Sequence, residues 1–216
     1  MRKQFQNQVK DLKLELVMLG SMIEEAVHNS IKSIKNNNQQ LAEQVINQDN
    51  RVDKYEQKIE QKSISLLALQ QPVAHDLRQI DATLKIASDL ERIGDLALNI
   101  SYISKKLSVS YPNYSLPHRI NRMADFLQYN LREALSAFIE ENQEQAGEVA
   151  ARDQKIDRLD QQIVNEMTSN LTQKKAPVGV INYWLFISRY LERIGDHITN
   201  ICEWIVYICC GKRVDY

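Results

Sequence analysis

The chain has 216 residues and a net charge of −1, and hydrophobic and charged residues make up 44% and 25% of it. This composition is that of a folded globular protein, and its near-neutral charge gives no general attraction for nucleic acid. Six glycines and four prolines are few for this length, which favours long helices over sheets. We find no secretory signal and no apolar run of about 20 residues, so we expect a soluble, cytoplasmic protein.

Apolar residues recur at alternating intervals of three and four positions, the period of an amphipathic helix. Asparagine and proline interrupt this pattern, and a stretch rich in proline and serine at 108–117 divides the chain into halves. The pattern predicts six long helices, over about residues 9–34, 41–69, 72–107, 118–140, 143–171 and 177–210.

The two halves are related in sequence as well as in plan. Asp89–Ile100 reads DLERIGDLALNI and Tyr190–Ile201 reads YLERIGDHITNI, with eight of twelve positions identical. Asp49–Ile59 and Asp153–Ile163 match in the same order with four identities. Duplication is the natural interpretation. It predicts an all-α fold, a tandem repeat of two antiparallel three-helix bundles, with repeats at 1–107 and 118–216 joined by a linker at 108–117.

Both repeats carry pairs of carboxylates four residues apart, a spacing that puts them on one face of a helix. In a helical hairpin, residues equally far from the turn lie at the same height. Asp53 and Glu91 are equally far from Pro72, and Asp157 and Glu192 are equally far from the turn expected at 172–176. We therefore expect four carboxylates at one level in each repeat: Asp49, Asp53, Glu91 and Asp95, then Asp153, Asp157, Glu192 and Asp196.

Such oxygen-rich clusters suit hard metal ions. Magnesium, calcium, manganese or iron would fit them better than zinc, and the sequence does not choose among these ions. Asn99 and Asn200 follow Asp95 and Asp196 by four residues, so their carbonyls are candidate further ligands. A single acidic pair is usually only a solvated helix face, and that interpretation stays open here. The matched and duplicated pairs favour metal binding.

The sequence carries no pattern of a catalyst. Serine, histidine and acidic residues show no triad context, and neither a glycine-rich phosphate loop nor a Glu-x-x-His pair is present. The three cysteines, Cys202, Cys209 and Cys210, all lie near residue 216 and predict no disulfide framework. We therefore expect a protein that is not an enzyme. The alternative of a metal-dependent enzyme or a metal-storage bundle stays open.

With its doubled ERIGD, the paired Asp-x-x-x-Asp motifs at Asp49 and Asp153, and the segment Pro72–Arg78, the chain resembles the PhoU family of bacterial phosphate-signalling proteins. The likeness covers nearly the whole length. It implies two three-helix bundles that bind iron or other divalent ions at the eight carboxylates named above. One departure is that residues 177–182 read PVGVIN, without the Ala-x-Asp-Leu-Arg of the first repeat, so the repeats are expected to differ in their partner contacts.

The resemblance also implies a role. The family is a negative regulator of the phosphate-starvation response and of high-affinity phosphate uptake. It is thought to couple the ATPase subunit of the phosphate ABC transporter to a phosphate-sensing histidine kinase, which implies peripheral association with the membrane through these partners. The sequence leaves the oligomeric state open between a monomer and a homodimer.

Overall fold

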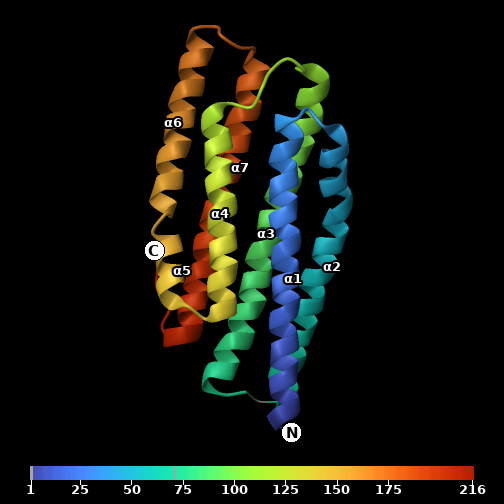
Figure 1. Ribbon diagram of the computed structural model, residues 1–216, viewed down its shortest axis with the longest axis vertical. Helices are drawn as coiled ribbons and strands as arrows, with labels where there is room; N and C mark the ends of the chain where they lie inside the picture. Colours follow the sequence, from blue (N-terminus) through green and yellow to red (C-terminus); the bar gives the residue numbers. More distant parts are fainter. Residues whose placement is uncertain (1, 71) are drawn as a thin grey trace.

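The protein, seen in a computed structural model, is a long bundle of antiparallel helices (Figure 1). The structure describes residues 2–70 and 72–216, so Met1 of the first predicted repeat and Gln71 of the predicted hairpin turn lie outside it. Within these residues no helix has the length and apolar character that a bilayer crossing needs. The helices are α1 (Arg2–Lys35), α2 (Gln39–Gln70), α3 (Ala74–Ser110), α4 (His118–Glu140), α5 (Gln143–Ala150), α6 (Asp153–Thr172) and α7 (Val178–Cys210).

Local sequence explains where these helices begin and end. Asn37 adopts a left-handed conformation after α1, and the Asn38 side chain accepts the Leu41 N–H at the start of α2. Pro117 and Pro177 stand directly before α4 and α7, where a missing N–H costs nothing. At 1.5 Å per residue, α1 is about 50 Å long, which makes the molecule a rod.

The predicted fold is confirmed, with one departure: the middle helix of the second repeat is interrupted into α5 and α6. At the interruption the Arg152 N–H bonds to the Val149 carbonyl (3.1 Å), a tighter turn than an α-helix makes. The Arg152 guanidinium reaches the buried Asn130 side chain on α4 (3.4 Å) and lies 5.3 Å from the Tyr129 ring centre. We attribute the interruption to these contacts, which hold the Arg152 side chain against α4. The spacing of apolar residues in the sequence does not indicate them.

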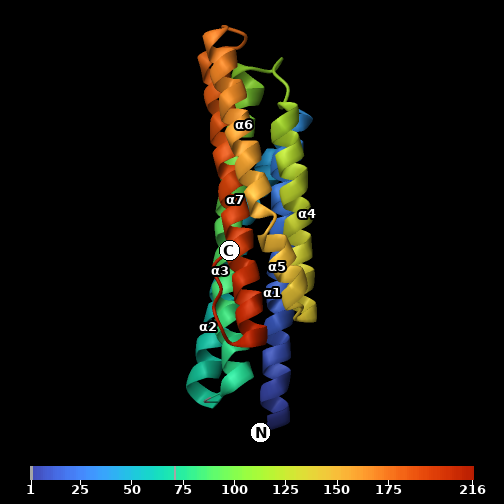
Figure 2. The same cartoon turned by 90° about the vertical axis from the view of Figure 1, so that its left-hand side faces the viewer.

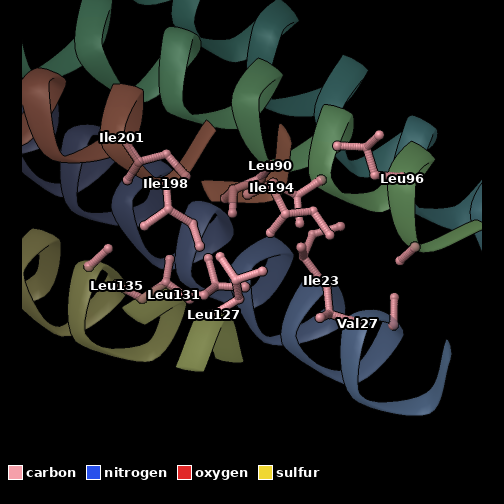
Figure 3. Close-up of a cluster of buried hydrophobic side chains, with 14 of the residues drawn as sticks. Ile23, Val27, Leu90, Leu96, Leu127, Leu131, Leu135, Ile194, Ile198 and Ile201 are labelled. Carbon is pink, nitrogen blue, oxygen red and sulfur yellow. The ribbon is translucent and has the colours of Figure 1, made fainter. Parts of the chain in front are cut away.

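The two repeats share one apolar core. The antiparallel helices α3 and α7 lie at its centre, and α1 and α4 pack beside them. Leu90 of α3, Ile194 of α7, Ile23 of α1 and Leu131 of α4 contribute to this core (Figure 3). The outer helices α2 and α6 lie at opposite edges of the molecule (Figure 1). The predicted repeat boundaries stay a prediction; α3 itself continues to Ser110, into the predicted linker.

A core substitution in the first repeat should therefore destabilise the second. Leu90 is fully buried, so Leu90→Ala should cost about 3 kcal/mol of unfolding free energy. Both tryptophans, Trp184 and Trp204, belong to the second repeat. We would follow urea unfolding by tryptophan fluorescence and by circular dichroism. In Leu90→Ala the unfolding midpoints of both signals should fall to lower urea concentration together. Met18→Ala, at a half-exposed position of the same repeat, should leave both curves nearly unchanged. A fluorescence transition unmoved by Leu90→Ala would contradict the shared core.

Candidate functional site

The first acidic cluster lies between α2 and α3. Asp49 and Asp53 on α2, and Glu91 and Asp95 on α3, are all half-buried. Burial raises the pKa of Asp49, and the charges of Asp53 and Asp95 raise it further. Burial also raises the pKa of Glu91, as do the charges of Asp95 and Asp53. Charges on the two helices thus act on one another across the hairpin, at the level that the register predicts.

The second cluster repeats this arrangement between α6 and α7. Asp153 and Glu192 are half-buried, whereas Asp157 and Asp196 are more exposed. Burial, followed by the charges of Asp157 and Asp196, raises the pKa of Asp153 to about 6. Burial and the charge of Asp157 raise the pKa of Asp196, and burial and the charge of Asp196 raise that of Glu192. The sequence-predicted carboxylates are therefore brought together in both repeats.

Each cluster has an arginine that offsets part of its negative charge. Arg92 Nη1 lies 3.3 Å from Asp95 Oδ2, and its Nε lies 3.5 Å from Glu91 Oε2. In the second cluster Arg189 pairs with Glu192 Oε1. The other oxygen of Glu192 is buried and has no hydrogen-bond partner in the described part of the chain. Both clusters keep excess negative charge, which is the electrostatic condition for attracting a cation.

The glycine of each ERIGD motif allows a neighbouring helix to approach closely. A Cβ added at Gly94 would lie 3.0 Å from Ile23 Cδ1 of α1. One added at Gly195 would lie 2.9 Å from Asp153 Oδ1, at the first turn of α6. A side chain at position 195 would therefore displace the carboxylate of Asp153, a candidate ligand, whereas one at position 94 would disturb the packing of the core.

Two further acidic residues join the clusters and were missed from the sequence. The charge of Glu56 acts on Glu91, and that of Asp160 acts on Glu192. Asp160 also accepts a hydrogen bond from the Ser188 hydroxyl at 2.6 Å. Glu56 and Asp160 occupy equivalent positions of the matched segments, three residues beyond the second aspartate. The spacing that places them on the same helix face was the available signal.

The asparagines proposed as additional ligands are placed differently in the two repeats. Asn99 is exposed on α3. Asn200 donates its side-chain amide to Asp89 Oδ1 of α3 at 3.2 Å, and the same oxygen lies 2.9 Å from His197 Nδ1. This polar group joins α7 to α3 rather than to α6. The predicted ligand roles of Asn99 and Asn200 stay predictions.

The clusters bring carboxylates near one another without forming a finished coordination shell. Among the residues that the structure describes, no three His, Cys, Asp or Glu side chains are grouped closely enough to hold a metal ion. The chemistry of the donors suits a hard cation, because carboxylate oxygens are its preferred ligands. A bound ion would require the carboxylates of facing helices to turn toward one another.

Comparison with known proteins identifies the family. The model of the PhoU domain matches residues 16–103 and again residues 120–205. The chain belongs to the PhoU family. A curated PhoU relative, the phosphate-specific transport system accessory protein PhoU homolog of Clostridium acetobutylicum, is 37% identical over 99% of this chain and 98% of its own. The homolog of Rhizobium meliloti is 31% identical over 97% of this chain and 88% of its own.

Solved PhoU structures share the fold over almost the whole length. The crystal structure of the phosphate transport system regulatory protein PhoU from Streptococcus pneumoniae has a TM-score of 0.91 at 26% identity, covering 98% of this chain and 100% of its own. That of PhoU from Pseudomonas aeruginosa has a TM-score of 0.92 at 28% identity, covering 96% and 100%. The matches confirm two PhoU repeats.

The segment Pro72–Arg78, present only in the first PhoU repeat, makes an internal contact. Arg78 Nε donates to the Ile208 carbonyl in the last turn of α7 at 3.2 Å. A basic side chain at this end of a helix satisfies a carbonyl that has no partner within the helix. Arg78 therefore joins the start of α3 to the end of α7, which gives this difference between the repeats a structural role.

The raised pKa of Asp153 predicts a pH-dependent stability. The folded protein holds this proton more tightly than the unfolded chain, so the protonated carboxyl contributes stability below pH 3.8 that is lost as the pH rises through about 6. Asp153→Asn stays neutral and should be more stable than wild type at about pH 7.5. After allowance for solvent screening, we expect a gain of about 1 kcal/mol.

Thermal unfolding of both proteins in metal-free buffer across this pH range measures the effect. The gain should shrink toward zero near pH 3, which is below the ordinary pKa of 3.8, because the wild-type carboxyl is then largely protonated in both states. Asp11→Asn, at an exposed position on α1, serves as the control and should change little at any pH. A gain that is the same at every pH would instead indicate a packing effect.

Proposed function

We propose that this PhoU-family chain is a metal-binding, non-catalytic regulator. It represses the phosphate-starvation response and high-affinity phosphate uptake by linking the ATPase subunit of the phosphate transporter to a phosphate-sensing histidine kinase. The names of its relatives, phosphate-specific transport system accessory proteins, support the role in this system. The duplication of a carboxylate cluster on the shared fold is the observation that carries the metal-binding part.

The metal-binding part rests on the charge left over in each cluster. Carboxylates raised in pKa by burial and by one another are poorly stabilised as a group of anions, and a divalent cation would relieve this repulsion. The buried oxygen of Glu192, which has no hydrogen-bond partner among the described residues, supports the second cluster in particular. The residues proposed to hold the ion are those of the sequence prediction, with Glu56 and Asp160 as additions from the structure.

We propose that the bound cation draws α2 toward α3, and α6 toward α7, by cross-linking carboxylates of facing helices. Such an ion supplies charge neutralisation and a fixed geometry; the long exposed helix faces then serve as the docking surface for the transporter and kinase. Location at the inner face of the membrane through these partners is part of the same proposal. An adaptor of this kind needs no open coordination position and no general base.

Metal content separates this proposal from a merely solvated acidic surface. Protein purified without chelator or added metal would be analysed by elemental analysis, as wild type and as the variant Glu91→Gln, Asp95→Asn, Glu192→Gln and Asp196→Asn. We expect near-stoichiometric metal in wild type and a loss of about tenfold or more in the variant, because charged oxygen ligands are removed from both clusters.

Matched controls assign the loss to the clusters. A variant with the same loss of charge at exposed sites, Asp11→Asn, Glu25→Gln, Glu140→Gln and Glu144→Gln, should keep its metal. The pair Glu91→Gln and Asp95→Asn should remove the metal of the first repeat alone. Equal trace amounts of metal in every protein would refute the metal-binding part of the proposal, whereas the regulatory part would still stand.

The regulatory part needs a cellular test. In bacteria whose own PhoU gene is deleted, expression of this chain should lower phosphate uptake and silence a phosphate-starvation reporter in phosphate-replete medium. The variant lacking the four ERIGD carboxylates should fail to repress although it accumulates to the same level. An unchanged reporter with wild-type protein, in a host whose own PhoU does restore repression, would count against the proposal.

A further inference from the structure

A hollow of about 740 Å³ lies between α4 and α6, the yellow-green and orange helices of Figure 2. A hollow of this size can hold a small molecule. We call it the basic hollow, and it is lined by His118, Arg119, Arg122, Gln162, Asn165 and Glu166. None of these residues belongs to an acidic cluster. Because all six side chains are polar or charged, a ligand here would be recognised by charge and hydrogen bonds.

The guanidinium of Arg119 is already fixed within the basic hollow. Its Nε donates to Glu166 Oε2 at 2.8 Å, and its Nη1 donates to Gln162 Oε1 at 2.8 Å. Both acceptors lie on α6, so the orientation of the guanidinium is set without a ligand. Its Nη2 has no hydrogen-bond partner among the described residues. A guanidinium held in this way can bind an oxyanion with little further loss of side-chain freedom.

His118 and Arg122 add hydrogen-bond donors that no contact of the fold uses. Both side chains are exposed, and neither forms an ion pair within the part of the chain that the structure describes. Arg122 follows Arg119 by three residues, so the two guanidinium groups lie on one face of α4. Two guanidinium groups against the one carboxylate of Glu166 give the lining a net charge of +1 with His118 neutral. Such an excess favours an anion, and guanidinium forks match the oxygens of phosphate.

The ion pair across this helix pair occurs in both repeats, with its charges reversed. The PhoU domain model begins at residues 16 and 120, so equivalent positions differ by 104, as they do for Asp49 and Asp153. At this offset Arg119 corresponds to Glu15, and Glu166 corresponds to Lys62. The Lys62 ammonium pairs with Glu15 between α1 and α2, as Arg119 pairs with Glu166 between α4 and α6. The pair therefore has a structural role that either arrangement of charges can fill.

The other two basic residues have no counterpart of this kind. His118 and Arg122 correspond to Leu14 and Met18, which are 55% and 52% exposed. A repeat can therefore fold with uncharged, half-exposed side chains at these positions. The donors of His118 and Arg122 are surplus to the packing of α4 against α6, and they distinguish the second repeat from the first.

We propose that the basic hollow binds a small inorganic oxyanion of the phosphate class. Arg119 supplies the fixed guanidinium, and Arg122 and His118 supply the surplus donors. Pyrophosphate binds more tightly than phosphate, because its two phosphoryl groups allow Arg119 and Arg122 each to contact a different one. The lining has no hydrophobic side chain on which a nucleoside could stack, so a nucleoside adds nothing to the affinity. This inference is independent of the metal and partner parts of the proposed function.

Calorimetric titration of the metal-free full chain with pyrophosphate, at constant ionic strength, tests the proposal. We expect saturable binding, and weaker binding of inorganic phosphate. The variant His118→Gln and Arg122→Gln should bind pyrophosphate about tenfold more weakly, because charged donors are lost. Both positions are exposed, so the variant should keep the circular dichroism and unfolding midpoint of wild type. Lys85→Gln with Lys106→Gln, which removes exposed positive charge elsewhere, should bind as wild type does.

A variant with a gain of affinity separates binding from a purely structural role. Glu166→Gln keeps an acceptor for Arg119 and raises the net charge of the lining from +1 to +2, so it should tighten pyrophosphate binding about threefold or more. The variant that lacks the four ERIGD carboxylates should bind pyrophosphate unchanged, because its substitutions lie outside the basic hollow.

Four results would overturn the proposal. These are the absence of saturable binding, equal binding by the His118 and Arg122 variant, an equal loss in the lysine control, and no gain in Glu166→Gln. A fifth arm compares ATP with tripolyphosphate. Equal affinity supports an inorganic oxyanion, whereas much tighter binding of ATP would overturn that assignment in favour of a nucleotide.

Discussion

The packing of α3 against α7 is the interaction on which the rest of this structure depends. Each of these helices carries one ERIGD motif, and their antiparallel contact fuses two bundles that came from one duplicated unit. Because α1 and α4 bury apolar residues beside the same pair, the cores of the two repeats are continuous with each other. The acidic clusters are displaced to the far sides of the central pair, where α2 and α6 supply the opposing carboxylates.

Electrostatic repulsion within the two acidic clusters destabilises the folded protein. Placing half-buried carboxylates at one level raises their pKa values and costs stability at neutral pH. The cation proposed above would offset this cost by neutralising the carboxylates. The arginines at the two clusters, Arg92 and Arg189, stand at positions that do not correspond between the repeats, so the carboxylates are the shared element.

Much of the helical fold and the pairing of the carboxylates could be predicted from the sequence, because both follow from its periodicity and its internal repeat. Counting outward from Pro72 was enough to bring Asp53 and Glu91 to one height, since two straight helices joined by a short turn leave little freedom of register. Glu56 and Asp160 were missed although the same rule places them on the same face. The interruption at Arg152 and the environment of Asn200 depend on which neighbour each side chain meets, and that is decided by tertiary packing.

The interruption between α5 and α6 makes the two clusters mechanically unlike. Asp49 and Asp53 stand midway along the continuous helix α2, so neither can move without its flanking turns. Asp153 is the first residue of α6, directly after the point where the helical hydrogen bonds are broken. Bringing the carboxylates of the first cluster closer together would require α2 to bend. In the second cluster, a change of backbone conformation between α5 and α6 would be enough. The duplicated carboxylates therefore lie within a continuous helix in the first repeat and next to a break in the helical hydrogen bonding in the second.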